Sequence, residues 1–296
     1  MTCRVMAAPP RPPYHPAMNT VAAPAAARPL SALPFGQHLR RWREHRRLSQ
    51  LDLADEAGVS TRHLSYMETG RAAPSREMVL RLAGRLDIPL RERNALLVAA
   101  GYAPMYRERP LTDPALAAAR AAVDLILQSH EPWPALAVDR HWNLVAANRM
   151  VSPLLAGADA ALLQPPMNVL RLSLHPQGIA PNIVNLAQWR GHIFERLRQQ
   201  IHATGDAGLA ALLDELRAYP MPDGAGAVTL AGEHLGVAMP LQFRSPAGVL
   251  SFISTTTVFG TPLDVTLQEL ALETFFPSDA FTADVLRALH AQAVDP

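Results

Sequence analysis

Hydrophobic residues recur at helical spacing from residue 35 to about residue 100. Ser49 and Ser60 precede two of these apolar runs, and serine at such a position caps a helix by accepting a backbone hydrogen bond. Gly58 and Gly70 follow the runs, where glycine tolerates the left-handed backbone that ends a helix. The pattern therefore predicts five short helices with tight joints, which together form one compact all-α unit.

Beyond residue 111 the pattern becomes a mixture of helices and strands. DPALAAARAAVDLILQSH is predicted to be a helix, and the short apolar runs ALAVD and LVAAN flank the turn RHWN as paired strands. A helical middle follows, clearest in IVNLAQWRGHIFERLRQQIHATG. Its apolar stripe consists of Ile183, Leu186, Ile193, Leu197 and Ile201.

The last part of this region is predicted to be rich in strands. VAMPLQFR and VLSFISTTTVFG flank a Ser-Pro-Ala-Gly turn, and LQELALETFF alternates apolar and polar residues as a third strand would. A final amphipathic helix is predicted from Ser278 to Gln292. Two strands, several helices and three strands predict an α+β domain in which helices cover one antiparallel sheet.

Prolines and alanines dominate the first 34 residues, which show little periodicity. Such a composition buries too little apolar area to fold, so residues 1–34 are predicted to be a disordered tail. The prolines interrupt any signal-peptide core, and no apolar run is long enough to predict a membrane span. Cys3 is the only cysteine, which excludes an intrachain disulfide and suits a reducing cytoplasm.

The net charge of +1 hides two oppositely charged parts. Residues 35–110 hold fourteen arginines and nine acidic residues, whereas residues 111–296 hold ten arginines and seventeen acidic residues. A basic front part and an acidic rear part indicate a polyanionic partner for the front part alone.

The segment LSQLDLADEAGVSTRHLSYMETGR reads as two helices joined by a tight turn. Ala54 is small where the helices approach each other, and Gly58 permits the left-handed turn. On the second helix, Val59, Leu64 and Met67 fall on one face and bury it against the unit. The polar residues at its N-terminal end then face outward, in the geometry by which a recognition helix reads the major groove.

This pattern closely resembles the helix-turn-helix domain of the phage-repressor-like, Xre-type family of DNA-binding regulators. The resemblance implies that Gln50 and Arg71 hold backbone phosphates, contacts that set the register on DNA. It also implies that Arg43 and Glu68 form a structural ion pair within the fold. The residues predicted to contact DNA are Gln50, Ser60, Thr61, Arg62, His63, Ser65, Tyr66 and Arg71.

The alternative for any polar helix is a solvated face without a partner. The complete motif favours DNA contact, with Thr61, Arg62 and Tyr66 carrying the sequence preference and Arg62 placed for a bidentate contact with guanine. One such unit reads only a few base pairs. A homodimer is therefore expected, with its two recognition helices one DNA turn apart.

The rear part of the chain is similar to the ligand-binding domain of MmyB-like transcription regulators. The segments that carry the likeness include PALAVDRHWNLVAAN, NVLRLSLHPQGIAPNIVNLAQW and FGTPLDVTLQELALETFFP. The resemblance implies a PAS-like α+β fold with an antiparallel sheet of about five strands. It also implies a small apolar, fatty-acid-like ligand held between the sheet and the helices.

The expected organisation is therefore a multidomain chain, α followed by α+β. The disordered tail covers residues 1–34, the five-helix helix-turn-helix DNA-binding domain 35–103, a linker 104–113 and the PAS-like ligand-binding domain 114–292. The surrounding segment Leu97–Pro114 is rich in proline, tyrosine and arginine and is expected to couple the two domains.

Large apolar side chains with a few polar groups among them are what a small-molecule site requires. The strand Ser251–Thr257 offers hydroxyls to a polar head group, and His141, His175 or Arg190 would supply a further partner. The alternative is that the aromatic residues only fill the core, as a domain of this size requires. The predicted pocket residues are Trp142, Leu170, Trp189, Arg190, Phe194, Phe252, Phe259 and Phe275.

The sequence lacks the nucleotide-binding GxxxxGK, the zinc-binding HExxH and the nucleophile motif GxSxG. His192 and Glu195 lie within one helical turn, but such pairs are common on solvated faces and a zinc site would need a third ligand. We expect no enzymatic activity, no cofactor and no metal, in a bacterial cytoplasmic protein that joins the nucleoid when bound to DNA. The alternative function is a DNA-binding regulator whose rear domain serves dimerisation or protein interaction without a small-molecule ligand.

Overall fold

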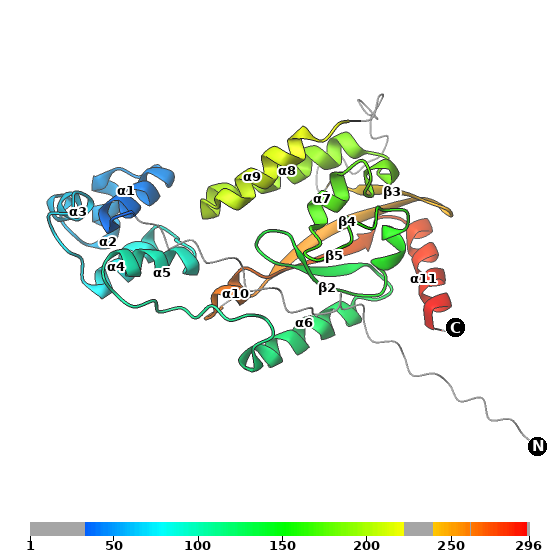
Figure 1. Ribbon diagram of the computed structural model, residues 1–296, viewed down its shortest axis with the longest axis horizontal. Coiled ribbons are helices and arrows are strands. Elements are labelled where there is room, and N and C mark those ends of the chain that lie inside the picture. The colour runs from blue at the N-terminus through cyan, green and yellow to red at the C-terminus, as the bar shows by residue number, and fades with distance from the viewer. Residues whose placement is uncertain (1–32, 222–238, 261, 295–296) are drawn as a thin grey trace, which may run out of the picture.

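The computed structural model describes residues 33–221, 239–260 and 262–294. The predicted tail lies outside these residues except for its last two positions, 33 and 34. The described chain forms a helical domain followed by an α+β domain (Figure 1). Within the described ranges, no helix combines the length and the apolar character needed to cross a bilayer.

Five helices form the N-terminal domain, as the apolar pattern predicted: α1 Phe35–His45, α2 Gln50–Ala57, α3 Thr61–Glu68, α4 Arg76–Arg85 and α5 Leu90–Ala99. Ser49, Ser60 and Ser75 cap α2, α3 and α4, because each side-chain oxygen accepts a hydrogen bond from a backbone N–H in the first turn. Gly58 ends α2 in the left-handed conformation, with φ 67° and ψ 38°. The cap residues therefore fix where these helices begin and end.

Arg43 and Glu68 connect α1 to the end of α3 inside this domain. Arg43 Nε lies 2.6 Å from Glu68 Oε1 and Nη2 lies 3.0 Å from Oε2, while Nη1 donates to the carbonyl oxygen of Leu48 at 2.8 Å. The hydrogen bonds to Glu68 raise the pKa of the Arg43 guanidinium, although burial acts in the opposite direction. Gly36 brings the two helices close, since a Cβ there would lie 2.4 Å from the carbonyl oxygen of Glu68.

The C-terminal domain is built on one five-stranded antiparallel sheet with the order β2-β1-β5-β4-β3, the sheet expected of a PAS-like domain. The strands are β1 Ala135–Val138, β2 Leu144–Ala147, β3 Leu241–Ser245, β4 Gly248–Val258 and β5 Ala271–Pro277. The helices are α6 Ala117–Ser129, α7 Val169–Leu174, α8 Leu186–Thr204, α9 Ala207–Ala218, α10 Val265–Gln268 and α11 Ala280–Val294. Short 3-10 helices are η1 Pro114–Leu116, η2 Ser152–Leu155 and η3 Ala180–Asn182.

Helices lie on both faces of this sheet and bury β1 completely, whereas the last four residues of β4 are exposed. In Figure 1, α7, α8 and α9 lie over one face, while α6 and α11 lie on the other side. Strand β1 is buried at all four positions and divides its side chains between the faces. Leu136 and Val138 belong to the core beneath α8, whereas Ala135 and Ala137 pack in the cluster that contains α6.

The segment LQELALETFF corrects the sequence prediction in its first half. Leu267 and Gln268 belong to α10, and strand β5 begins only at Ala271. Asp264 caps this short helix by accepting a hydrogen bond from Thr266 N at 2.9 Å. The alternating pattern identified the strand but overlooked the aspartate that starts a helical turn before it.

Replacing Glu68 by alanine is expected to destabilise the helical domain by about 3–5 kcal/mol, because Arg43 would stay buried without its partner. The free energy of unfolding from urea titration measures the loss, and hydrogen exchange of the α1 and α3 amides assigns it to this domain. Glu77→Ala is the control, since Glu77 is 84% exposed in its pair with Arg81 and should cost less than about 1 kcal/mol. A similarly small loss for both variants would contradict the structural role of the buried pair.

Candidate functional site

The turn between α2 and α3 fixes the direction of α3. The N–H of Val59 donates to the carbonyl oxygen of Ala54 at 2.9 Å across the left-handed Gly58. Ala54 is fully buried where the helices meet, and Leu64 and Met67 bury the inner face of α3. The opposite face of α3 is therefore presented to solvent, starting from the N-terminal end of the helix.

The exposed edge of α3 is a preassembled group of one aromatic ring and two cations. Arg62 and Arg71 are exposed, and their guanidinium carbons lie 5.3 and 6.0 Å from the ring centroid of Tyr66. Arg62 Nε also donates a hydrogen bond to the hydroxyl of Tyr66 at 2.9 Å. Cation–π contact and the hydrogen bond hold both positive charges at the surface without neutralising them. Such an edge suits a polyanion.

The other residues predicted to contact DNA lie around this edge. His63 and Ser60 are exposed, whereas Thr61 and Ser65 are half-buried on the same helix. The hydroxyl of Ser60 accepts a hydrogen bond from His63 N at 3.2 Å, so it also serves as the cap of α3. These side chains are accessible together from one side of the domain.

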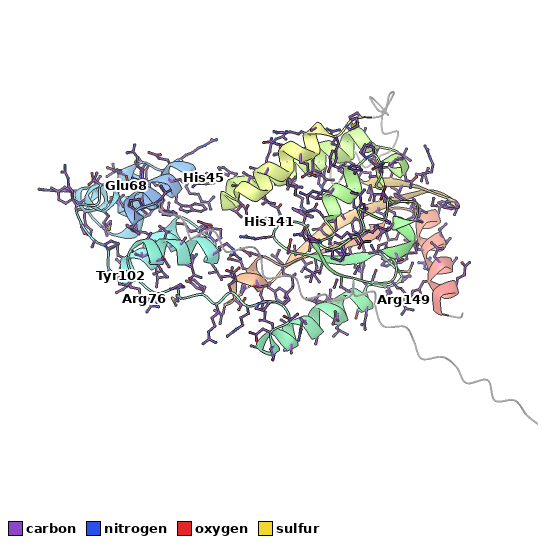
Figure 2. All side chains as sticks on the ribbon, viewed as in Figure 1. His45, Glu68, Arg76, Tyr102, His141 and Arg149 are labelled. Atoms are coloured by element: carbon purple, nitrogen blue, oxygen red, sulfur yellow. The ribbon has the colours of Figure 1, made fainter. Side chains whose placement is uncertain are left out.

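Gln50 contacts the buried ion pair instead of the exposed edge of α3. It is half-buried at the start of α2, and its amide nitrogen donates to Glu68 Oε2 at 2.7 Å. Figure 2 shows Glu68 within the helical domain. The phosphate contact that resemblance implies for Gln50 stays a prediction, whereas the structure places its amide on the buried Arg43–Glu68 pair.

The C-terminal domain holds an apolar cavity of about 110 Å³ between the sheet and α7 and α8, named here the inner cavity. Its polar lining comes from four residues: Ser173, His192, Arg196 and Glu273. Its apolar lining is Pro134, Leu136, Trp142, Leu144, Val151, Leu154, Leu155, Met167, Val169, Leu170, Leu172, Ile179, Trp189, Ile193, Leu241, Phe252 and Phe275.

An ion pair forms the polar end of the inner cavity. Arg196 on α8 holds Glu273 on β5 through two contacts, Nη2–Oε1 at 2.5 Å and Nη1–Oε2 at 3.0 Å. The guanidinium carbon of Arg196 also lies 4.5 Å from the ring centroid of Trp142. The side chain of Glu273 is 5% exposed and that of Arg196 is 24% exposed, so the carboxylate is the more deeply buried partner. The charged groups of the cavity thus form one ion pair at its polar end.

His192 and Trp189 continue this wall about one and two turns before Arg196 along α8. Trp189 Nε1 donates to Ser173 Oγ at 3.0 Å, and its ring stacks on His192 with centroids 5.5 Å apart. Burial lowers the pKa of His192, and the nearby Arg196 cation lowers it further. Both effects favour the uncharged imidazole of His192, which lines the cavity.

Five of the eight predicted pocket residues line the inner cavity: Trp142, Leu170, Trp189, Phe252 and Phe275. The other three lie elsewhere. Arg190 points toward α9, where its guanidinium donates to the backbone oxygens of Leu216, Arg217 and Tyr219. Its guanidinium carbon lies 5.1 Å from the ring centroid of Phe194. Phe259 packs beside the cluster beneath α6. Arg190 and Phe194 differ from the cavity residues because they are on the adjacent face of α8.

The predicted partners for a polar head group also lie outside the inner cavity. His141 Nε2 contacts Asp206 Oδ2 at 3.0 Å, and His175 packs its ring edge against Tyr219. In the strand Ser251–Thr257, Phe252 lines the cavity, while Ser254 and Thr256, which share its face, do not. The hydroxyl of Thr256 instead contacts the guanidinium of Arg196.

The sequence contained a signal for the polar residues that the prediction missed. Trp189, His192, Ile193 and Arg196 follow the i, i+3, i+4, i+7 spacing of one helix face, so Trp189 alone identifies the others. Glu273 had no such signal, because it pairs across the sheet with Leu136 of β1, which is far away in sequence.

A charged cleft of about 1,520 Å³ lies between the two domains. Figure 2 shows His45 on the side of α1 that faces the end of α8. His45 Nε2 contacts the backbone oxygen of His202, and Arg46 Nη2 donates to the backbone oxygen of Ala203 at 3.3 Å. Burial raises the pKa of Glu92, which also lines this cleft. Polar contacts from His45 and Arg46 thus bridge one side of the cleft.

On the other side of the cleft, α5 contacts α10 and the start of β5. The N–H of Leu90 donates to Gln268 Oε1 at 2.8 Å. Arg91 contacts Glu269 at 2.7 and 2.9 Å, and it also holds Glu108 of the linker through Nη1 at 2.8 Å. Burial lowers the pKa of Arg91, but the carboxylates of Glu269 and Glu108 raise it above the ordinary value of an arginine.

The linker itself is attached to both domains. Asn94 on α5 accepts hydrogen bonds from Met105 N and Tyr106 N and donates to the carbonyl oxygen of Tyr106. Further on, Thr266 Oγ1 donates to the carbonyl oxygen of Arg109 at 2.6 Å. The segment predicted to couple the domains is therefore hydrogen-bonded to α5 of the helical domain and to α10 of the C-terminal domain.

No group of three or more His, Cys, Asp or Glu side chains in the described ranges could hold a metal ion. A family model described as an MmyB-like transcription regulator ligand binding domain matches residues 119–289, which is more than half of the chain. A second family model, a helix-turn-helix domain, matches residues 34–96. No curated protein matches the chain.

Replacing Arg196 by glutamine is expected to raise the pKa of His192, because the cation that opposes its protonation is removed while Glu273 remains. Imidazole C–H chemical shifts followed by NMR over pH 4–8 would measure the change. Arg198→Gln removes an exposed charge two residues further along α8 and should leave this titration unaltered. An unchanged His192 titration in the Arg196 variant would contradict the electrostatic coupling.

Proposed function

The chain belongs to the MmyB-like transcription regulators, and we propose that it binds a specific DNA operator as a homodimer and responds to a fatty-acid-like carboxylate in the inner cavity. DNA binding and ligand binding are the properties that its two matched families describe. A specific operator, a homodimer and a carboxylate ligand are what we propose in addition to these properties. The proposed setting is the bacterial cytoplasm, where the DNA is.

The exposed edge of α3 is the observation that carries DNA binding. Arg62 and Arg71 flank Tyr66 on the solvent face of a helix whose opposite face is buried. An arginine near the start of a recognition helix can make a bidentate contact with guanine, whereas one just beyond its end is placed for a phosphate. One such helix covers a few base pairs, so two copies on a two-fold axis would read two half-sites.

The inner cavity supports an apolar ligand with one anionic group. Its walls are apolar, and its charged groups are Arg196 and the carboxylate that neutralises it, Glu273. A ligand carboxylate would compete with Glu273 for the same guanidinium, because both offer two oxygens to its planar donors. His192 beside it, with its uncharged imidazole favoured, would be a further hydrogen-bonding partner.

The two elements joined by this ion pair also hold the helical domain. Helix α8 carries Arg196 and ends in the contacts from His45 and Arg46. Strand β5 carries Glu273 and begins beside Glu269, which holds Arg91. A ligand that exchanges with Glu273 therefore acts on both attachments of the DNA-binding domain. It shifts the balance of domain arrangements by as much as its affinity differs between them.

The outward face of α6 favours a second candidate function, in which the C-terminal domain serves association only. Leu125 and Ile126 are 64% and 42% exposed there, and Ala118, Ala121 and Ala122 are exposed beside them.

A ligand that prefers the folded state adds roughly 2.7 kcal/mol of stability at a hundred times its dissociation constant. Thermal unfolding with decanoate distinguishes the two functions, since a domain used only for association would show no shift.

Two arginine variants test the roles assigned to the α3 edge. Arg62→Ala should lose about 1–3 kcal/mol of discrimination at one base pair, while Arg71→Ala should weaken binding to every duplex and lower the salt slope by about 1. Fluorescence anisotropy on an operator selected from random DNA, and on its scrambled version, measures both at several salt concentrations. Arg217→Ala on α9 is the charge-matched control. Equal losses on both duplexes for both edge variants would overturn the assignment.

A variant of the cavity cation tests the ligand chemistry. Arg196→Gln should weaken decanoate binding roughly ten- to hundredfold, because a hydrogen bond to a charged group contributes about 1.5–3 kcal/mol. Isothermal titration calorimetry on the full chain provides the affinities. Neutral decanol should bind to both proteins alike, and Arg198→Gln should behave as the unaltered chain. Equal decanoate affinities in all three proteins would exclude Arg196 as the carboxylate partner.

A further inference from the structure

The inner cavity is too small for a long aliphatic chain. Its volume is about 110 Å³, and an engineered apolar cavity of about 150 Å³ holds benzene. Fewer than six carbon atoms would therefore fill it. Sites for small molecules commonly measure roughly 300–1,000 Å³. A ligand with a longer chain needs space beyond the closed cavity.

A second hollow, named here the outer groove, borders the same wall from the other side. Its volume is about 460 Å³, and together the two volumes fall within the range for small-molecule sites. The residues that line both spaces are Leu144, Val151, Leu155 and Met167. These four apolar side chains thus form a shared partition between the inner cavity and the surface.

The backbone on one side of the partition is held, while its side chains can turn. The N–H of Leu144 donates to the carbonyl oxygen of Met167 at 2.7 Å, which fixes β2 against the chain before α7. Met167 has three rotatable side-chain bonds and adapts readily to new neighbours. Leu155 is the last residue of η2 and precedes Gly157, which adopts φ +88°. Rotation of Met167 and Leu155 would open the partition without moving the sheet.

The distribution of polar residues between the two spaces determines how a ligand is oriented. None of Ser173, His192, Arg196 and Glu273 lines the outer groove, so the charged end belongs to the inner cavity. Asn148 lines the groove, but its amide oxygen accepts from Ala135 N and its nitrogen donates to the carbonyl oxygens of Leu127 and Trp133. The remaining groove wall is largely apolar and suits an aliphatic tail.

We propose that the inner cavity and the outer groove form one binding channel, opened by rotation of Leu155 and Met167. The ligand is a linear carboxylate of more than six carbons, with its head group at Arg196 and its tail in the outer groove. Leu155 then sets the longest chain that is accepted. This inference rests on the proposed ligand site and adds the length of the ligand to it.

The affinity of the full chain for hexanoate, decanoate and tetradecanoate tests the channel. Calorimetry is done below the concentrations at which these carboxylates form micelles. Affinity should rise by up to about fourfold for each methylene beyond hexanoate, because each added group leaves water for the groove. Equal affinities for the three carboxylates would overturn the channel and leave the inner cavity as the whole site.

A substitution in the partition provides the second test. Leu155→Trp should bring the ratio of tetradecanoate affinity to hexanoate affinity close to one, whatever its effect on hexanoate itself, since the indole blocks the passage. Leu155→Ala should keep or increase that ratio. Leu125→Trp makes the same exchange on the exposed face of α6 and should alter no affinity. If the Leu155→Trp variant does not fold, the profiles of the unaltered chain and of Leu155→Ala still decide.

The outcomes separate this inference from the function on which it rests. Binding of none of the three carboxylates by the unaltered chain would reject the proposed ligand and the channel together. Binding with no dependence on chain length would reject only the channel. An unchanged gain from longer tails in Leu155→Trp would show that the tail takes another path and would overturn the role of Leu155.

Discussion

The ion pair between Arg196 and Glu273 lies where the sheet, the longest helix and the inner cavity meet. It joins α8 to β5, the middle strand of the sheet, and Glu273 is almost completely removed from water. Removing two charges from water costs several kcal/mol, which good geometry and further hydrogen bonds only partly offset. The two contacts between the side chains and the ring of Trp142 supply that geometry. A ligand carboxylate that takes the place of Glu273 on Arg196 leaves Glu273 buried without its partner, so the ligand must offset that cost with its own contacts.

Polar contacts also attach the two domains to each other. Arg91 shares its guanidinium between Glu269 of the C-terminal domain and Glu108 of the linker. Asp206 lies on the opposite side of the cleft; its burial alone would raise its pKa, but His141 and Arg140 lower it to about 2. Polar interfaces of this kind are typical of domains that move relative to each other. Each domain has its own hydrophobic core.

The sequence predicted the helical domain more completely than the cavity, for a physical reason. Ser49, Ser60 and Gly58 act on backbone groups within a few residues of themselves, so their effect is visible in the local pattern. The Xre-type resemblance placed Arg43 beside Glu68, a contact over 25 positions that no local pattern contains. The inner cavity depends on contacts across still longer separations. Arg190 was predicted from the sequence as a pocket residue, whereas the helical phase of α8 turns Arg196 toward the cavity.

Helix α8 runs without interruption from the inner cavity to the helical domain. At about 1.5 Å per residue, roughly 21 Å of helix separates Trp189 from Ala203. The helix therefore works as a lever arm: a tilt of about 5° around Trp189 would displace its far end by roughly 2 Å. Displacements of that size at helix contacts are sufficient for switching in many proteins. A rearrangement too slight to disturb the packing around the ligand would thus be enough to separate His45 and Arg46 from their carbonyl partners.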